Sequence, residues 1–518
     1  MSESADPSIL RPPIKPIHRE LRDPESRQIS ELIARWRKQD AVFARAMESD
    51  KAQALGSLGV RLCLQNRHED SRTVLNAALM LSPDDIELLN NLAVVFDRDG
   101  RTEQAIQTVE CSLALSNTQP DSWIFLGNMK QKQGDLAGAA TAFESAISLD
   151  ATSALAWQGL GLVRQQQHEF AVAIECLRNC IRLNHVTAPI LSVLGQLFYS
   201  TGQFEKSRDA CEAAVSDDPQ NPVYRRMLRE MRFVCDMIDG SSIEVAINAY
   251  LIDHAGFTIE QDAEDLLHKS FALLSSYGYT DAARVVAEKR LALFPHSASA
   301  AYFVHAIRGD ETLARSPDQY IIESFDKMAE HFDDHLTHAL GYNIPQKLSN
   351  ALIGFIAPGT GLDILDAGCG TGLCGPHLRP ITASLTGVDL SQKMLEQARQ
   401  KGIYDSLVCS ELTSFLTIAP ARFDLIIAAD LVIYFGDLVP LAAGMALSLK
   451  PGGWVAFSTE VAESSGWRLL SSGRFAHDPA YIRSIFNEEF IECLCQETTV
   501  RLEAVRAVPG NIFVFRRR

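Results

Sequence analysis

A leucine followed by a small residue recurs every 34 positions through the first half of this 518-residue chain. The five pairs are Leu58-Gly59, Leu92-Ala93, Leu126-Gly127, Leu160-Gly161 and Leu194-Gly195. A fixed period of this length is typical of stacked helical pairs, because one pair can bury its apolar face only against its neighbours. The period therefore predicts an α-solenoid with a concave surface.

Two further positions of each unit fit this packing. A small or polar residue recurs at Ser71, Ala105, Ala139, Ala173 and Ser207, and a larger one at Leu75, Val109, Phe143, Leu177 and Cys211. The small residue lets two helices cross closely, and the large one fills the groove between them. The pattern resembles the tetratricopeptide repeat, with five units over residues 52–221. The resemblance implies a groove for a protein or peptide; the alternative is that the repeats form a homo-oligomer or brace the rest of the chain.

The segments around the repeats lack this register. Residues 1–25 are rich in proline and charge, which predicts a flexible arm, and a helix is expected over 26–51, near Ser26–Met47. Residues 222–310 are expected to form connector helices, beginning with a long helix and an irregular stretch. They include one degenerate repeat that ends at Pro295.

A glycine-rich turn follows an apolar run near residue 364. Asp366 is followed by Gly368, Gly370 and Gly372, and the next apolar run ends in Asp389. Glycines allow a sharp turn and the close approach of a ligand, where a Cβ would collide. A carboxylate at the end of the second strand is placed to accept the hydroxyls of a ribose. This combination indicates a nucleoside cofactor.

The spacing of the glycines is compatible with two cofactors, a nicotinamide dinucleotide and S-adenosylmethionine. Glycines at 370, 372 and 375 also fit the dinucleotide fingerprint, so an oxidoreductase with a nicotinamide cofactor is one alternative. However, a negative charge at Asp366 would repel a pyrophosphate and suits the cationic amino acid end of S-adenosylmethionine. The run 362–373 resembles motif I of class I S-adenosylmethionine-dependent methyltransferases. Residues 423–430 resemble the fourth strand of that family, and 449–457 its turn into the fifth.

The resemblance covers residues 318–518 and implies an α + α/β multidomain chain, with a solenoid followed by a Rossmann-like, seven-stranded methyltransferase domain over 311–518. It implies S-adenosylmethionine as cofactor, a lid helix within 316–334, and a reversed final hairpin from 490–499 and 511–515. It also implies that Phe325, Tyr342 and Asn343 approach the methionine end of the cofactor.

The resemblance further assigns the adenine end and the site of methyl transfer. Glu411 occupies the position that binds the adenine amine, with helix capping as the alternative, and Leu390 and Leu412 are placed to sandwich the ring. Ala429 and Asp430 follow the fourth strand, where substrate and methyl group meet in this fold. The residues after Asp430 are not the Pro-Pro-Tyr version used for amide or exocyclic amine nitrogens, which disfavours DNA adenine and protein glutamine as acceptors.

The acceptor side offers several polar candidates. Tyr434 and Phe435 are expected at the acceptor site, Ser458, Thr459 and Glu460 at the carboxyl edge of the sheet, and Arg474, His477 and Tyr481 in one connector. Among these, His477 is the expected general base, because the unperturbed pKa of histidine lies near neutrality. The alternative is that His477 braces its loop or caps the following helix.

Composition excludes other classes of protein. A net charge of −17 argues against a general nucleic-acid binder, and no run of apolar residues is long enough for a membrane span. Eleven cysteines, an odd number without zinc spacing, argue against a disulfide framework or a metal site and favour the cytoplasm. The sequence thus predicts a methyltransferase whose repeats recruit a protein partner, with an unidentified acceptor. The competing hypothesis is an interaction scaffold whose methyltransferase-like domain is inactive or only senses the cofactor.

Overall fold

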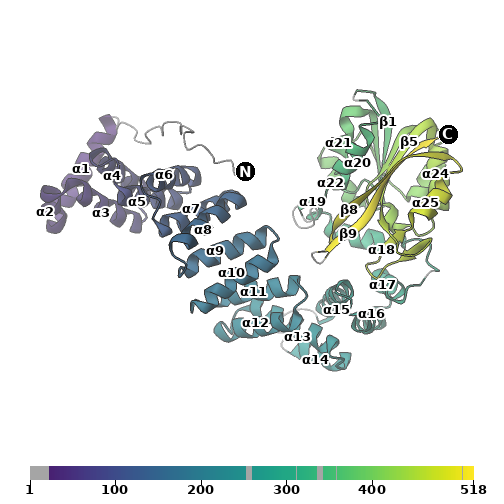
Figure 1. Cartoon of the computed structure of the whole chain (residues 1–518), viewed down its shortest axis with the longest axis horizontal. Helices are drawn as coiled ribbons and strands as arrows, with labels where there is room; N and C mark the ends of the chain where they lie inside the picture. Colours follow the sequence, from purple (N-terminus) through teal and green to yellow (C-terminus); the bar gives the residue numbers. More distant parts are fainter. Residues whose placement is uncertain (1–22, 253–258, 311, 335–341, 358, 504–505) are drawn as a thin grey trace, which may run out of the picture. The chain divides into compact units, whose positions relative to one another are not determined.

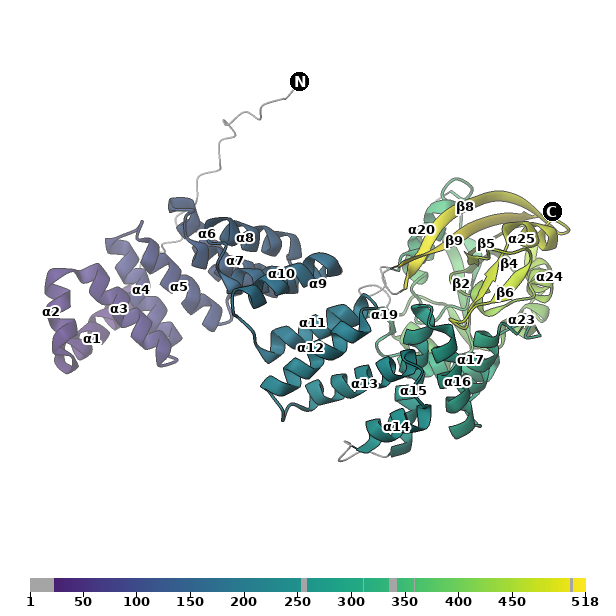
Figure 2. The ribbon, with the colours of Figure 1, turned by 60° about the horizontal axis from the view of Figure 1, so that its bottom comes forward.

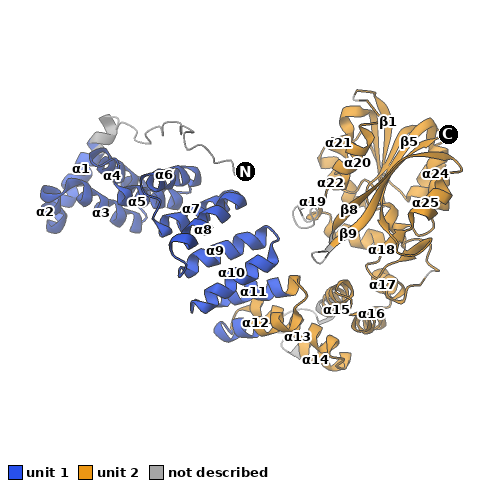
Figure 3. Ribbon diagram, viewed as in Figure 1, with its two compact units in different colours: residues 1–198, 212–219 blue, residues 199–211, 220–518 orange. Residues whose placement is uncertain are grey.

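The computed structural model describes residues 23–252, 259–310, 312–334, 342–357, 359–503 and 506–518 (Figure 1). The expected flexible arm lies almost entirely outside the described residues. The chain divides into two compact units, residues 1–198 with 212–219 and residues 199–211 with 220–518 (Figure 3). No helix in the described ranges is long and apolar enough to cross a membrane.

The N-terminal part consists of helices. They are α1 (Asp23–Gln39), α2 (Ala41–Ser49), α3 (Lys51–Leu64), α4 (His68–Leu81), α5 (Ile86–Arg98), α6 (Thr102–Leu115), α7 (Pro120–Gln133), α8 (Leu136–Leu149), α9 (Ala154–Gln166), α10 (Phe170–Arg182), α11 (Ala188–Ser200) and α12 (Phe204–Asp217). The expectation of one helix over Ser26–Met47 is wrong. Asp40 adopts an extended conformation and its carboxylate accepts hydrogen bonds from the Val42 and Phe43 N–H groups, so that α2 starts as a separate helix.

The small and large positions of the repeat meet as the pattern predicts. The large residue of the second helix packs against the glycine of the first in the pairs Leu75–Gly59, Phe143–Gly127 and Leu177–Gly161. A Cβ at Gly127 would lie 2.8 Å from the ring of Phe143, and one at Gly159 only 2.3 Å from it. One buried ring thus occupies the space left by glycines of two different helices, α7 and α9, and joins successive pairs.

Five helices connect the repeats to the sheet. They are α13 (Pro222–Ile238), α14 (Ile243–Ile252), α15 (Ile259–Ser276), α16 (Thr280–Leu293) and α17 (Ala298–Arg308). Residues 222–262, expected to be a long helix followed by an irregular stretch, thus contain α13, α14 and the start of α15. The segment expected as a degenerate repeat corresponds to the end of α15 and to α16.

The C-terminal part is built on a mostly parallel sheet (Figure 2). Its strands are β1 (Leu362–Ala367), β2 (Thr382–Asp389), β3 (Ser406–Cys409), β4 (Phe423–Ala428), β5 (Leu449–Val461), β6 (Trp467–Leu469), β7 (Phe475–His477), β8 (Phe490–Glu503) and β9 (Arg506–Arg517). Strands β3-β2-β1-β4-β5 are parallel; β9 pairs antiparallel with β5, and β8 with β9. The expected reversed final hairpin is therefore present.

The sheet has nine strands among the described residues, rather than the seven expected. Seven of them form the predicted arrangement, and β6 and β7 form an additional hairpin at the end of β5. Glu460 of β5 pairs with Gly510 of β9 and also with Ala476 of β7. Because β9 pairs with one edge of β5 at Glu460, β7 must pair with the opposite edge of β5. This is the edge that β4 occupies nearer the start of β5, so β7 lies beyond the carboxyl end of β4. The extra pair was missed because each of its strands is only three residues long.

Alternate residues of the strands contribute to two cores. Leu365, Ile426 and Val455 pack with helices α23 (Leu412–Thr417), α24 (Val439–Ser448) and α25 (Pro479–Phe486). The neighbouring strand residues Ile364 and Leu425 pack with α20 (Ile344–Leu352) and α21 (Gly375–Leu378). Helices therefore cover both faces of the sheet, as Figure 1 shows, and ligands in such sheets bind at the carboxyl ends of the strands. The remaining elements are α18 (Asp318–Met328), α19 (Phe332–Asp334), α22 (Gln392–Gln400) and the 3-10 turns at 379–381 and 432–434.

Candidate functional site

A cavity of about 260 Å³ lies at the carboxyl ends of β1, β2 and β4. The turn after β1 forms part of its wall, and Gly368, Gly370 and Gly372 all have positive φ, at 66°, 54° and 88°. At Gly370, which lines the cavity, a Cβ would meet no heavy atom within 4 Å. At Gly372 the space is taken by the ring of Tyr404, 2.8 Å from the position of a Cβ. Gly370 thus leaves room for a ligand, whereas Gly372 lets the turn pack against the ring of Tyr404.

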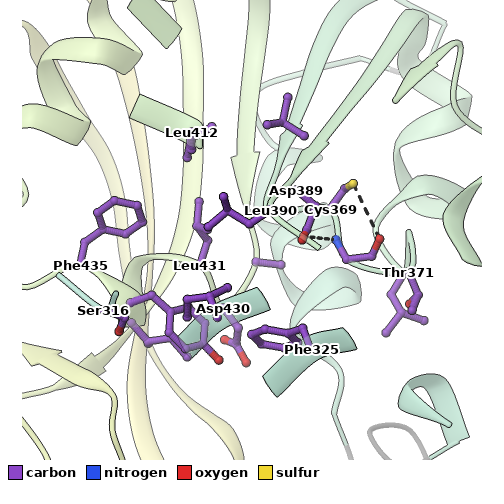
Figure 4. A pocket seen from close by; sticks show the side chains of 18 of the residues that line it. Ser316, Phe325, Cys369, Thr371, Asp389, Leu390, Leu412, Asp430, Leu431 and Phe435 are labelled. Atoms are coloured by element: carbon purple, nitrogen blue, oxygen red, sulfur yellow. Dashed lines mark hydrogen bonds between the residues drawn. The ribbon is translucent and has the colours of Figure 1, made fainter. Parts of the chain in front are cut away.

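Asp389, at the end of β2, lines the same cavity and holds the turn in place. Its two carboxylate oxygens accept hydrogen bonds from the Gly370 and Ser391 N–H groups, each at 2.8 Å. Figure 4 shows the first of these bonds. Burial raises the pKa of Asp389, while these backbone donors oppose the shift. Each oxygen retains a lone pair that can accept a hydroxyl of a ligand.

Asp366 lies at the end of β1, beneath the turn, and is only 1 % exposed. One carboxylate oxygen, Oδ2, accepts a hydrogen bond of 2.6 Å from the Tyr404 hydroxyl. The other, Oδ1, is buried and has no hydrogen-bond partner among the described residues. Burial raises the pKa of Asp366 to about 7; the hydrogen bond from Tyr404 opposes this shift and the negative charge of Asp389 adds to it. Asp366 is not among the residues that line the cavity, so a ligand cation would act on it across the turn, through the low-dielectric interior, and would stabilise its ionised form without direct contact.

The adenine-side candidates lie at the carboxyl ends of the neighbouring strands β2 and β3. Leu390, Glu411 and Leu412 all line the cavity. Glu411 is the N-cap of α23: its oxygens accept the Thr413 and Ser414 N–H groups at 2.9 and 2.8 Å, and it pairs with Arg315 at 3.1 Å. The capping alternative therefore describes what Glu411 does in this structure, and a ligand amine would add to these bonds.

Asp430 and Tyr434 lie on the opposite side of the cavity, after β4, together with Ala429. Asp430 has a positive φ of 50°, and its conformation is fixed by Ser458: the Asp430 N–H donates to Ser458 Oγ, and that hydroxyl donates to Asp430 Oδ1, both at 2.9 Å. Burial raises the pKa of Asp430, an effect that Arg501 and Arg474 oppose. A carboxylate of raised pKa is a more effective proton acceptor.

The expected lid region contributes aromatic side chains. Phe325 of α18 and Phe332 of α19 line the cavity, as does Tyr342, and the rings of Phe325 and Tyr434 meet edge to face at 5.8 Å (Figure 4). Asn343, by contrast, is exposed and does not line the cavity. Its expected approach to the cofactor is wrong, because the chain turns into α20 at this residue.

His477 does not line the cavity either, so its expected role as general base is wrong. It is fully buried in β7, where its Nε2 is bonded to the Phe435 carbonyl at 2.7 Å and its ring stacks on Tyr481. Desolvation lowers the pKa of His477 to about 4, so the ring is neutral at physiological pH. The loop-bracing alternative describes this residue.

Three residues near the site were not predicted from the sequence, because their partners are far away in the chain. Tyr404, Arg315 and Arg501 surround the site, yet they stand 38, 96 and 41 positions from the partners Asp366, Glu411 and Glu460. No local pattern links residues so far apart. The tyrosine could have been suspected only from its neighbours in space, the glycines at 372, 375 and 387.

These residues fit S-adenosylmethionine better than a dinucleotide. A carboxylate under the turn with one oxygen unpartnered among the described residues suits a cation, and the open space at Gly370 suits close approach of a ligand. A pyrophosphate in the same place would face Asp389 and lie above the buried charge of Asp366.

Family models match two parts of the chain. Residues 365–457 match a methyltransferase domain, and residues 120–153 and 159–222 match tetratricopeptide repeats. A ubiquinone biosynthesis O-methyltransferase of Thiobacillus denitrificans is 36 % identical over 108 residues, which are 20 % of this chain and 46 % of that protein. A malonyl-[acyl-carrier protein] O-methyltransferase of Enterobacter lignolyticus is 27 % identical over 157 residues, 29 % of this chain and 60 % of that one. The chain thus spans about half the length of these relatives.

Two solved structures resemble separate parts of the chain. The N-methyltransferase NodS from Bradyrhizobium japonicum, in complex with S-adenosyl-L-homocysteine, is 19 % identical, with a TM-score of 0.31 over 38 % of this chain and 98 % of that one. The pilF protein of Pseudomonas aeruginosa is 19 % identical, with a TM-score of 0.35 over 42 % of this chain and 98 % of that one. Together with the fold, the family matches show that the chain carries tetratricopeptide repeats followed by a methyltransferase domain.

Proposed function

We propose that the chain transfers a methyl group from S-adenosylmethionine to an acceptor in the cavity at the ends of β1, β2 and β4. The observation that carries this proposal is the pair of carboxylates beside the glycine turn, buried Asp366 and half-buried Asp389. In the proposed arrangement Asp389 accepts the ribose hydroxyls, Asp366 attracts the cationic amino acid end, and Leu390 and Leu412 pack on the adenine. Gly370 leaves room for this ligand, whereas Gly368 and Gly372 shape the turn, packed against Leu431 and Tyr404.

When bound, S-adenosylmethionine supplies an activated methyl group, so the protein must align a nucleophile and exclude water. Phe325, Tyr342 and Tyr434 provide aromatic walls for this purpose. Asp430, next to Ala429, takes the role of proton acceptor that the sequence assigned to His477. Ser458 fixes its carboxylate, and burial raises its pKa toward that of an effective base.

The acceptor is proposed only at the level of its reacting atom. Both relatives named above are O-methyltransferases, which makes an oxygen nucleophile the first class to test. The repeats would recruit a protein partner, since helical repeat arrays present extended concave surfaces for binding. The competing proposal, a scaffold with an inactive domain, requires that the cavity bind no S-adenosylmethionine or bind it without methyl transfer.

Calorimetric titration of S-adenosylmethionine and of NADH into the full-length protein tests the cofactor. Asp389→Ala should weaken S-adenosylmethionine binding by about tenfold or more, because it removes a charged hydrogen-bond acceptor worth about 1.5–3 kcal/mol. Asp405→Ala is the matched control, since Asp405 is outside the cavity and pairs with Arg379. Thermal melting of both variants checks that the turn remains folded. Binding of NADH instead, or of neither ligand by the wild-type protein, would contradict the proposal.

A further inference from the structure

A second, larger cavity of about 1100 Å³ lies beside the first. Its walls come from α15, α16, α17 and α18, and from residues 470–474 before β7. Tyr302 of α17 ties these elements together, because its hydroxyl donates to the Gly473 carbonyl at 2.9 Å. Met328 and Arg474 line both cavities, so the two spaces are neighbours separated by these side chains.

The second cavity contains polar groups that the described residues leave unsatisfied. Arg290 is only 4 % exposed and is held by Glu264 and Ser299, each at 3.1 Å. Its Nε has no hydrogen-bond partner among the described residues, and the same holds for His268 Nδ1 and Ser472 Oγ, which belong to other walls. Because these three atoms are buried, a ligand in the cavity would reach the exposed polar ends of Asp265 and Lys327 instead.

Exposed apolar side chains adjoin these polar groups. Leu293 and Met328 line the cavity and are 44 % and 41 % exposed, and the rings of Phe271, Phe303 and Tyr320 form its inner wall. Large apolar side chains exposed around a cavity are typical of a surface that a ligand covers. Methionine in particular adapts its shape to different ligands.

The charges of the lining restrict the ligand. The cations Arg290, Lys327 and Arg474 are balanced by the anions Glu264, Asp265 and Glu323. A balanced lining disfavours a polyanion such as a nucleic acid, which requires an excess of Lys and Arg. An extended peptide fits better, because its backbone presents donors and acceptors along its whole length and its side chains can occupy apolar pockets.

We propose that the second cavity binds an extended peptide segment of the methyl acceptor, with one nucleophilic side chain passing Met328 and Arg474 into the first cavity. This inference rests on the proposed methyl transfer and names the class of acceptor: an unfolded segment of a protein. The peptide is held by α15–α18, a surface distinct from the groove of the N-terminal repeats.

Ala272 and Ala292 provide a matched pair of variants. Ala272 of α15 is exposed and lines the second cavity, so Ala272→Trp fills the space without disturbing a core. Ala292 of α16 is also exposed but does not line the cavity, so Ala292→Trp adds the same bulk outside it. The probe is a displayed library of random peptides of about 12 residues, an extended reach of about 40 Å. It is selected on the full-length wild-type protein, and fluorescent copies are then measured by anisotropy.

Selected peptides should bind Ala272→Trp at least about tenfold more weakly than the wild-type protein, and Ala292→Trp with unchanged affinity. The wild-type protein should also transfer tritium from labelled S-adenosylmethionine to them. Equal binding to Ala272→Trp, or failure to select any peptide with a protein that binds S-adenosylmethionine, would overturn the proposal. Binding without tritium transfer would overturn the acceptor assignment. Calorimetry of S-adenosylmethionine with each variant separates these results from failure of the proposed function, because peptide anisotropy needs no cofactor.

Discussion

The binding of S-adenosylmethionine should depend on pH through Asp366. The carboxyl of this residue has a pKa of about 7, so near neutral pH a large fraction of the protein carries it in the neutral form. A cationic ligand at this end of the cavity favours the ionised form, so binding must release a proton. The affinity should therefore rise as the pH rises through 7 and fall as the pH falls below it.

The magnitude follows from the titration of one group. With a pKa of about 7 in the free protein and an ionised carboxyl in the complex, the dissociation constant should be about 25-fold larger at pH 5.5 than at pH 7.5, or about 1.9 kcal/mol. The range ends at pH 7.5 because an α-amino group begins to lose its own proton near pH 8. At pH 6.5 about 0.8 proton should be released for each ligand bound.

Titration calorimetry at three pH values, in two buffers of different ionisation enthalpy, measures both quantities. Asp366→Asn should bind weakly and show little pH dependence. Asp363→Asn is the control on the same strand, since Asp363 is partly exposed and pairs with Lys450, whereas Asp366 is buried beneath the glycine turn. An affinity of the wild-type protein that is flat from pH 5.5 to 7.5, or a full dependence retained in Asp366→Asn, would refute the reasoning.

Three further perturbations test other parts of the structure. Tyr404→Phe removes the hydroxyl that donates to Asp366, so the pKa of that carboxyl should rise and the midpoint of the pH dependence of binding should shift upward in the same calorimetric series. His477→Gln should leave the pH profile of methyl transfer unchanged. Urea unfolding at several pH values should show that the free energy of unfolding of this variant falls less steeply below pH 6.5 than that of the wild-type protein. In the wild-type protein this residue's contribution is complete above pH 6.5 and is lost as the pH falls toward about 4, by about 1.4 kcal/mol per unit. Gly159→Ala should destabilise the repeats by about 1–3 kcal/mol, because its Cβ would overlap the ring of Phe143; circular dichroism melting measures this, and S-adenosylmethionine affinity should not change.

Much of the fold could be predicted from the sequence because its signals are local. The 34-residue period places a small residue opposite a large one in each helical pair, and Gly127 and Phe143 meet as that spacing predicts. The hairpin β6–β7 and the break between α1 and α2 escaped prediction. One depends on strands of three residues, and the other on a single capping carboxylate at Asp40.

Some residues of the candidate site could likewise be predicted from the sequence, and others could not. The glycine turn, Asp389 and Asp430 all line the cavity, since each follows a strand and the carboxyl ends of parallel strands meet at one edge of a sheet. His477 shows the limit of this reasoning. Its residue type suggested a base, yet whether an imidazole reaches a ligand depends on which neighbours bury it.

The sequence by itself determined the repeat array, the parallel sheet and the glycine turn with its two carboxylates, because these patterns are made by residues close together in the chain. Only the tertiary structure decided that His477 is sealed in β7, that Tyr404 holds one oxygen of Asp366, and that Met328 and Arg474 stand between two cavities. Burial and partnership are set by elements far apart in the sequence. Burial and hydrogen-bond partners control the pKa of a side chain and whether a ligand can reach it. They therefore decide which of the chemically suitable side chains can act.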